Sequence, residues 1–132
     1  MLTKKKYNNP NIISKFVPYI EVSDYLNAAD IGIIIRNNDI VNNVASPIKF
    51  SEYISCGLPV ISNKSVDIIT QMLENNKCGS LISLININDK VVNNLININR
   101  NKISQIGINY FGIDSVSNSY IEIYKQMNKD IV

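Results

Sequence analysis

The 132-residue chain has no histidine, no tryptophan and only two cysteines. Without histidine there can be no imidazole general base and no histidine ligand to a metal ion. The cysteines, Cys56 and Cys78, form no Cys-x-x-Cys pattern. They are therefore expected to be a reduced thiol pair or to pack in the core, with no disulfide framework.

Charged residues are few and long apolar runs are absent. A net charge of +2, with 18% charged and 45% hydrophobic residues, indicates a globular chain and is too weak to predict nucleic-acid binding. The longest apolar run, residues 31–35, is far short of the roughly 20 residues that span a bilayer. The basic start has no apolar region, so residues 1–11 are expected to be a frayed linker, not a signal peptide.

Apolar runs alternate with helical patterns along the rest of the chain, residues 12–132, which is expected to be one domain. The predicted strands are Lys15–Ile20, Asp30–Arg36, Pro59–Ser62 and Ser80–Ser83. The predicted helices are Val22–Ala29, Pro47–Cys56, Val66–Asn76, Asn88–Ile103 and Asp114–Met127, and residues 37–45 are expected to be a loop. This alternation predicts an α/β fold: a Rossmann-like parallel sheet flanked by helices, with right-handed crossovers.

Two details of these elements are specific enough to check. Gly57 follows the helix Pro47–Cys56, where a left-handed C-cap is expected. In the last helix one face is apolar, and we expect it to face the core. The residues of that face are Val116, Tyr120, Ile123, Tyr124 and Met127.

The helix that begins near Ser46 has an unusual first turn. Ser46 is a suitable N-cap and Pro47 a suitable first residue, but Lys49 places a cation at the positive end of the helix dipole. Ligands bind parallel sheets beyond the carboxyl ends of the strands, where Arg36 also lies. Lys49 therefore indicates an anion site, with phosphate the usual anion. Alternatively, Lys49 extends into water at a cost of some tenths of a kcal/mol.

Glu52 lies three residues after Lys49, on the same face of the helix. A carboxylate at this place can accept hydrogen bonds from the two hydroxyl groups of a ribose. It can equally form an ion pair with Lys49, and the two interpretations are compatible.

The segment from Ser46 to Ser62, SPIKFSEYISCGLPVIS, resembles the donor-binding segment of GT-B glycosyltransferases, in the large retaining group that builds bacterial polysaccharides and O-antigens. In one branch this segment reads Ser-Pro-x-Lys-x-x-Glu-Tyr and then Gly-x-Pro-Val. The matching residues are Ser46, Pro47, Lys49, Glu52, Tyr53, Gly57, Pro59 and Val60. The resemblance covers residues 12–124 and implies part of the C-terminal, donor-binding domain.

The resemblance implies roles for individual residues. Ser46, Pro47 and Lys49 would face the donor diphosphate together with Arg36, and Lys49 would stabilise the leaving diphosphate as the catalytic group. Glu52 would bind the ribose. Tyr19 and Ile20 would flank the base, although half-buried packing explains Tyr19 equally well.

The chain departs from the family in two ways. Val44 stands where the wider family often has a first glutamate that contacts the donor sugar. Asn42, Asn43 or Asp39 could replace it, or could simply be loop residues. The chain also lacks an N-terminal acceptor domain and the first strand–helix units of the donor domain, so a truncated domain is expected. Its open sheet edge would then invite a homodimer.

The resemblance implies transfer of a sugar from a nucleotide-diphosphate sugar, with a UDP-sugar favoured, to a lipid-linked or saccharide acceptor with retention of configuration. Such a protein would act in the cytoplasm, at most peripherally on the inner face of the cytoplasmic membrane. No cofactor is expected, and without an Asp-x-Asp motif no catalytic metal either. Two alternatives are a nucleotide-binding or assembly module with no activity by itself, and a nucleotide-sugar epimerase of the same fold.

Overall fold

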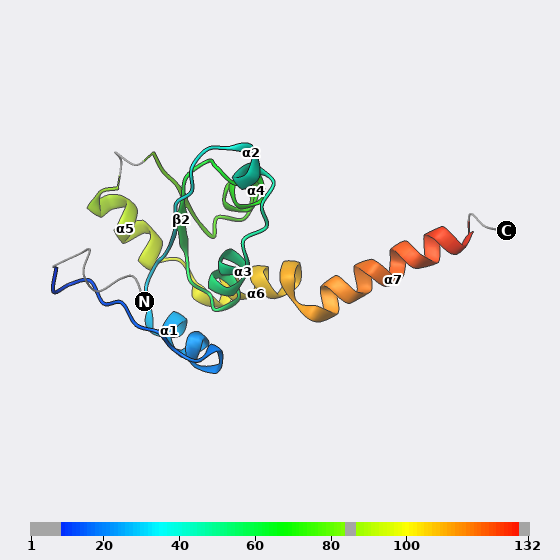
Figure 1. Cartoon of the computed structure of the whole chain (residues 1–132), viewed down its shortest axis with the longest axis horizontal. Coiled ribbons are helices and arrows are strands. Elements are labelled where there is room, and N and C mark those ends of the chain that lie inside the picture. Colours follow the sequence, from blue (N-terminus) through cyan, green and yellow to red (C-terminus); the bar gives the residue numbers. More distant parts are fainter. Residues whose placement is uncertain (1–8, 84–86, 130–132) are drawn as a thin grey trace.

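The computed structural model describes residues 9–83 and 87–129, and it has α/β architecture (Figure 1). Three short strands form a parallel sheet in the order β1–β2–β3. They are β1 (Gly32–Ile34), β2 (Val60–Ser62) and β3 (Gly79–Leu81). Val60 is aligned with both Gly32 and Gly79, so the three strands begin level with one another. The predicted parallel sheet with crossover helices is confirmed, and it is compatible with a Rossmann-like class.

Seven α-helices and one short 3₁₀ helix, η1, are present in the described part of the chain. They are η1 (Tyr19–Glu21), α1 (Val22–Ala28), α2 (Ile40–Asn43), α3 (Ile48–Ser55), α4 (Asp67–Asn76), α5 (Asp89–Ile96), α6 (Arg100–Phe111) and α7 (Ile113–Lys129).

Both faces of the sheet carry apolar contacts. The larger core lies on the side of α3, α4 and α6, and it is built from Ile34, Phe50, Ile54, Val60, Val66, Ile69, Met72, Leu73, Cys78 and Ile103. A smaller cluster of Ile61, Ile82 and Leu95 lies on the side of α5. On that second side Ile33 of β1 remains 59% exposed. The sheet is therefore well covered on one face and thinly covered on the other.

The predicted strand Lys15–Ile20 is wrong, because residues 15–18 have no regular structure and η1 begins at Tyr19. Pro18 has no N–H group for a sheet ladder, and its carbonyl oxygen instead accepts from the backbone N–H of Glu21 at 3.0 Å. Within the described residues β1 pairs only with β2, so no strand lies at its other edge.

The predicted single helix Asn88–Ile103 is also wrong, because the chain forms two helices there, α5 and α6. Asn99 interrupts the helical pattern: its side-chain oxygen accepts from the backbone N–H groups of Asn101 and Lys102 and so begins α6. The loop predicted at residues 37–45 likewise contains the single turn α2.

The expectation that the apolar face of the last helix lies in the core is wrong. The side chains of this face are between 39% exposed, for Val116, and 64% exposed, for Tyr124. Gly112 has extended backbone angles that end α6, and α7 then leaves the body of the molecule (Figure 1). The apolar residues share one face of α7 as predicted, but that face is exposed in the described part of the chain.

Candidate functional site

The candidate site lies around α3, whose buried residues Phe50 and Ile54 anchor the helix to the core. Because α3 leads into β2 through a short connection, its first turn lies toward the carboxyl edge of the sheet. Gly57 ends the helix with a φ of 72°, which confirms the predicted left-handed C-cap. A β-carbon there would lie 2.5 Å from the carbonyl oxygen of Arg100, so glycine is required for space as well as for backbone conformation.

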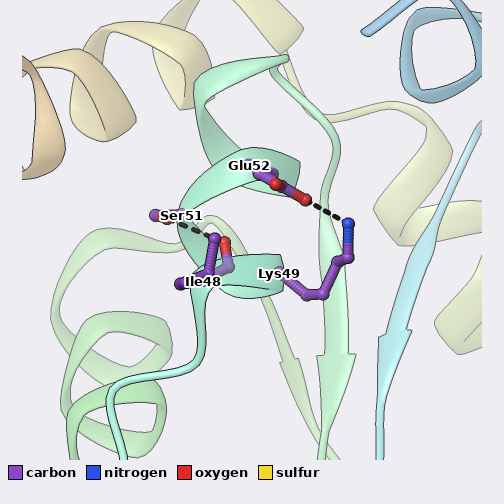
Figure 2. A network of polar contacts seen from close by, with 4 residues as sticks. All are labelled: Ile48, Lys49, Ser51 and Glu52. Atoms are coloured by element: carbon purple, nitrogen blue, oxygen red, sulfur yellow. Dashed lines mark hydrogen bonds and ion pairs between the residues drawn. The ribbon is translucent and has the colours of Figure 1, made fainter. Parts of the chain in front are cut away.

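Lys49 and Glu52 form an ion pair on one side of α3 (Figure 2). The Lys49 Nζ–Glu52 Oε2 distance is 2.6 Å, with the lysine side chain 57% exposed and the glutamate 17% exposed. The hydrogen bond from Lys49 to Glu52, followed by the carboxylate charge, raises the pKa of Lys49 above its ordinary value, although partial desolvation opposes this. The intrahelical pair is therefore formed, and anion binding by Lys49 stays a prediction.

A cavity of about 380 Å³ opens between η1, α1 and α3. Its lining residues are Tyr19, Ile20, Val22, Ser23, Leu26, Ser51, Glu52, Ser55, Cys56 and Phe111. Three of the predicted site residues, Tyr19, Ile20 and Glu52, thus share one cavity, whereas Ser46, Lys49 and Arg36 are not part of its lining. Tyr19 is 83% exposed, so its interpretation as half-buried packing is wrong.

Arg36 follows β1 as predicted, but its backbone is held by a residue that the sequence reasoning missed. The side chain of Asn63 accepts from the backbone N–H of Arg36 at 3.2 Å and donates to the Arg36 carbonyl oxygen at 2.7 Å. Asn63 also donates to the hydroxyl group of Ser65 at 2.8 Å. Asn63 directly follows β2, so the rule that singled out Arg36 after β1 would have found it as well.

Asn42, Asn43 and Asp39 form the turn around α2. The Asp39 carboxylate caps α2, accepting from the backbone N–H and from the side-chain amide of Asn42, both at 2.8 Å. The Asn43 amide nitrogen, oriented toward acceptors, lies 3.0 Å from the carbonyl oxygen of Ser65. The alternative that these are loop residues accounts for every one of these contacts, and contact with a donor sugar stays a prediction.

Ser46 does not cap α3, so that expectation is wrong. The helix begins one residue later than predicted, which makes Pro47 the N-cap, with extended backbone angles and no capping hydrogen bond from a side chain. Ser46 is exposed two residues before the helix. Its predicted role toward a diphosphate does not depend on capping and remains a prediction, as does that of Pro47.

The two cysteines have different surroundings, and both are free thiols. Cys78 is fully buried in the main core, which agrees with the expectation of core packing. Burial raises the pKa of its thiol. Cys56 lines the cavity beside Glu52. Desolvation and the Glu52 charge raise the pKa of Cys56, while Arg100 works in the opposite direction. Cys56 is a cavity residue that the sequence reasoning missed, because side-chain type alone could not place it.

Among residues 9–83 and 87–129, no group of three or more cysteine, aspartate or glutamate side chains is arranged to hold a metal ion. None of the helices in that part of the chain has the length and hydropathy to cross a bilayer. Comparison of the chain with models of protein families, with curated protein sequences and with solved structures found no match.

Proposed function

We propose that the chain is the donor-binding part of a GT-B glycosyltransferase, which transfers a sugar from a nucleotide-diphosphate sugar to an acceptor in bacterial surface polysaccharide synthesis. The observation that carries the proposal is the cavity beside Glu52, which brings a carboxylate and the exposed η1 residues Tyr19 and Ile20 around one space. Its volume of about 380 Å³ lies within the range of small-molecule sites.

The cavity can accept a nucleoside in one orientation. The ribose hydroxyl groups donate to the Glu52 carboxylate, which is the one acidic group of the lining. The base then lies toward η1, where the Tyr19 ring offers a stacking surface. The lining is uncharged apart from Glu52, so the base would be held by apolar contact and by hydroxyl and backbone groups. The family resemblance favours a UDP-sugar.

The diphosphate would lie outside the cavity, toward the first turn of α3. There Lys49, the helix N–H groups and the helix dipole would act on the same anion, and the proposal adds Ser46, Pro47 and Arg36 as further contacts. Lys49 holds Glu52 in the free chain. With a nucleotide bound, Lys49 would turn to the diphosphate and stabilise the charge that develops on it as the sugar leaves.

In this proposal the acceptor is lipid-linked or a saccharide, and a further domain provides its site. The reaction retains configuration and uses no metal ion. Two alternatives belong to other classes. The chain could bind a nucleotide or mediate assembly without activity of its own, or it could belong to a nucleotide-sugar epimerase, for which the absence of histidine leaves few acid–base groups.

The test is a calorimetric titration of the chain with UDP, GDP, CMP and inorganic phosphate. We expect saturable binding of UDP, weakened about tenfold or more in Glu52→Gln, a loss of ~1.4 kcal/mol. Lys49→Ala should weaken UDP binding more than uridine binding, because of the two ligands only UDP carries the diphosphate that Lys49 would contact.

The chain offers a matched control in Glu122 and Lys125 of α7. They form a second i,i+3 ion pair, at 2.8 Å, and neither lines the cavity. Glu122→Gln and Lys125→Ala should bind UDP like the parent chain. If Glu52→Gln and Glu122→Gln bind UDP with equal affinity, the assignment of the cavity as the nucleotide site is wrong. Turnover of a UDP-sugar by the chain alone would exclude the alternative in which the chain binds a nucleotide or mediates assembly but has no activity of its own.

A further inference from the structure

A second cavity lies between α4, α5 and α6, beside β3. Its volume is about 650 Å³, which is within the range of small-molecule sites. None of its lining residues also lines the cavity beside Glu52. The second cavity is therefore a separate place on the molecule, and its chemistry can be considered independently of the proposed nucleotide site.

The floor of the second cavity is apolar. Three helices contribute buried side chains to it, namely Leu73 of α4, Leu95 of α5 and Ile103 of α6. Half-buried side chains extend the same surface, and they are Val91, Ile98 and Ile106. Removing such a surface from water is favourable, so the floor suits a ligand with an apolar body.

The exposed part of the lining carries positive charge and no negative charge. Lys77 and Lys102 both line the second cavity and are exposed, whereas no aspartate or glutamate belongs to the lining. Neither lysine forms an ion pair in the part of the chain that the structure describes. An anionic group in the cavity would therefore meet two cations without displacing a carboxylate.

Lys77 is also held in a strained backbone conformation. Its φ of 52° lies in the left-handed region, which is unfavourable for a residue with a β-carbon. Strained residues of this kind are concentrated at ligand sites. Strain and positive charge thus coincide at one residue of the lining.

Uncharged hydrogen-bond donors accompany the two lysines. The side-chain oxygen of Asn99 accepts from the backbone N–H groups of Asn101 and Lys102, so its amide nitrogen remains as a donor. Asn94 of α5 adds a second amide to the lining. The N-terminus of α6, the positive end of its dipole, begins directly after Asn99. These groups all favour a negatively charged ligand.

We propose that the second cavity binds a small molecule that has one carboxylate or phosphate group and an apolar body. Lys77 and Lys102 hold the anionic group, and the amides of Asn94 and Asn99 donate to it. The apolar body lies on the floor formed by α4, α5 and α6. This site goes beyond the proposed glycosyl transfer and does not depend on it.

The first test is a calorimetric titration of the full chain with octanoate, octyl phosphate, octylammonium and acetate. We expect saturable binding of octanoate or octyl phosphate, about tenfold or more tighter than that of octylammonium, and weaker at higher salt. The tighter of the two anions identifies the preferred head group. Acetate should bind more weakly than octanoate, because it lacks the apolar body. No saturable binding of either octyl anion, or equal binding of octylammonium or acetate, would overturn the proposal.

The second test locates the tighter octyl anion with variants. Lys102→Ala and Lys77→Gly should each weaken its binding about threefold or more, because each removes one cation from the lining. Lys77→Gly should be at least as stable as the parent, since glycine adopts the left-handed conformation without strain, so its weaker binding cannot come from unfolding.

Two further variants serve as controls. Lys90→Ala removes an exposed lysine of α5 that is outside the lining, and it should bind the octyl anion like the parent. Glu52→Gln should also bind like the parent, whatever its effect on UDP. A loss in Lys90→Ala equal to that in Lys102→Ala would overturn the site. Changed affinity in Glu52→Gln would show that the anion occupies the other cavity, which would overturn it as well.

Discussion

At the scale of single residues, two helices end with left-handed backbone conformations, and the chain uses a different residue type at each. Gly57, with a φ of 72°, ends α3, and Lys77, with a φ of 52°, ends α4. Glycine adopts this conformation without strain, whereas a β-carbon costs about 1–2 kcal/mol. The sequence predicted the cap at Gly57 because glycine marks it, but nothing in lysine marks the equivalent position 77.

Replacing Lys77 by glycine should stabilise the chain. Removal of the β-carbon relieves the left-handed strain, partly offset by the extra freedom of glycine in the unfolded state, for a net gain of roughly 0.5–1 kcal/mol. Urea unfolding measures the change. Lys77→Ala is the matched control, because it removes the same charge and keeps the β-carbon, and it should lie close to the parent. Equal stability of both variants would show that Lys77 is not strained.

The Lys49–Glu52 pair predicts a pH dependence of stability. The folded-state pKa of Lys49 is raised, so its contribution is fully present below the unfolded value of about 10.4 and is lost as pH rises through the folded value. The lysine side chain is 57% exposed, so solvent screening limits the contribution to at most about 0.2–1 kcal/mol.

This dependence is measured as the difference in unfolding free energy between the parent and Glu52→Gln across pH 8 to about 11.5. The subtraction cancels the other lysines and tyrosines. We expect the difference to shrink above pH ~10.4. A difference that stays constant over this range would contradict an ion pair in solution.

At the scale of elements, Arg100 connects three helices. From the first residue of α6, its guanidinium donates to the carbonyl oxygens of Ala29 at 2.8 Å and of Leu26 and Cys56 at 3.4 Å each. These carbonyl groups lie at the C-terminal ends of α1 and α3, where helix carbonyls lack partners and cations are favourable. The sequence could not indicate this role, because Arg100 is about 71 and 44 positions from these acceptors.

Arg100→Ala should lower the free energy of unfolding by roughly 1.5–3 kcal/mol, since charge-assisted hydrogen bonds to partly buried carbonyl groups are lost. Thermal and urea unfolding report the loss. Arg100→Lys should recover only part of it, because an ammonium group cannot reproduce the planar set of donors. Lys102→Ala, two residues further along α6, serves as the control and should be close to neutral. A loss no greater than that of Lys102→Ala would count against the capping role.

Element prediction from the sequence was reliable where the signal is local. The helices near Val22, Pro47, Val66 and Asp114 are all present, as are the three later strands, with ends shifted by a few residues. It failed at Lys15–Ile20, because a strand exists only with a neighbour to pair with, and no neighbour is specified within the segment itself. It also failed to divide α5 from α6, because asparagine occurs throughout that region and Asn99 is not distinctive.

At the scale of the whole molecule, burial is uneven. β2 is the central strand and is buried along its length, whereas β1 has a free edge in the described chain and α7 projects away from the body. Regions with few buried contacts open at lower free energy than the core. Stability should therefore decrease from β2 and α3 outward to α7.

Hydrogen exchange measures this gradient. In dilute solution we expect the slowest exchange for amides of β2 and α3, and the fastest among the helices for α7. Protection of α7 equal to that of α3 at the lowest concentration would show that it packs within its own chain.

The sequence alone determined the features that depend on neighbours along the chain. Hydrophobic periodicity gave most helices and the parallel sheet, Gly57 specified its own cap, and the three-residue spacing placed Glu52 beside Lys49. Tertiary structure decided the features that depend on residues far apart in the sequence. These are the cavity between η1 and α3, the hydrogen bonds of the Asn63 side chain to the Arg36 backbone, and the exposure of α7. The physical reason is that periodicity shows that a face is apolar, but only three-dimensional packing decides what covers it.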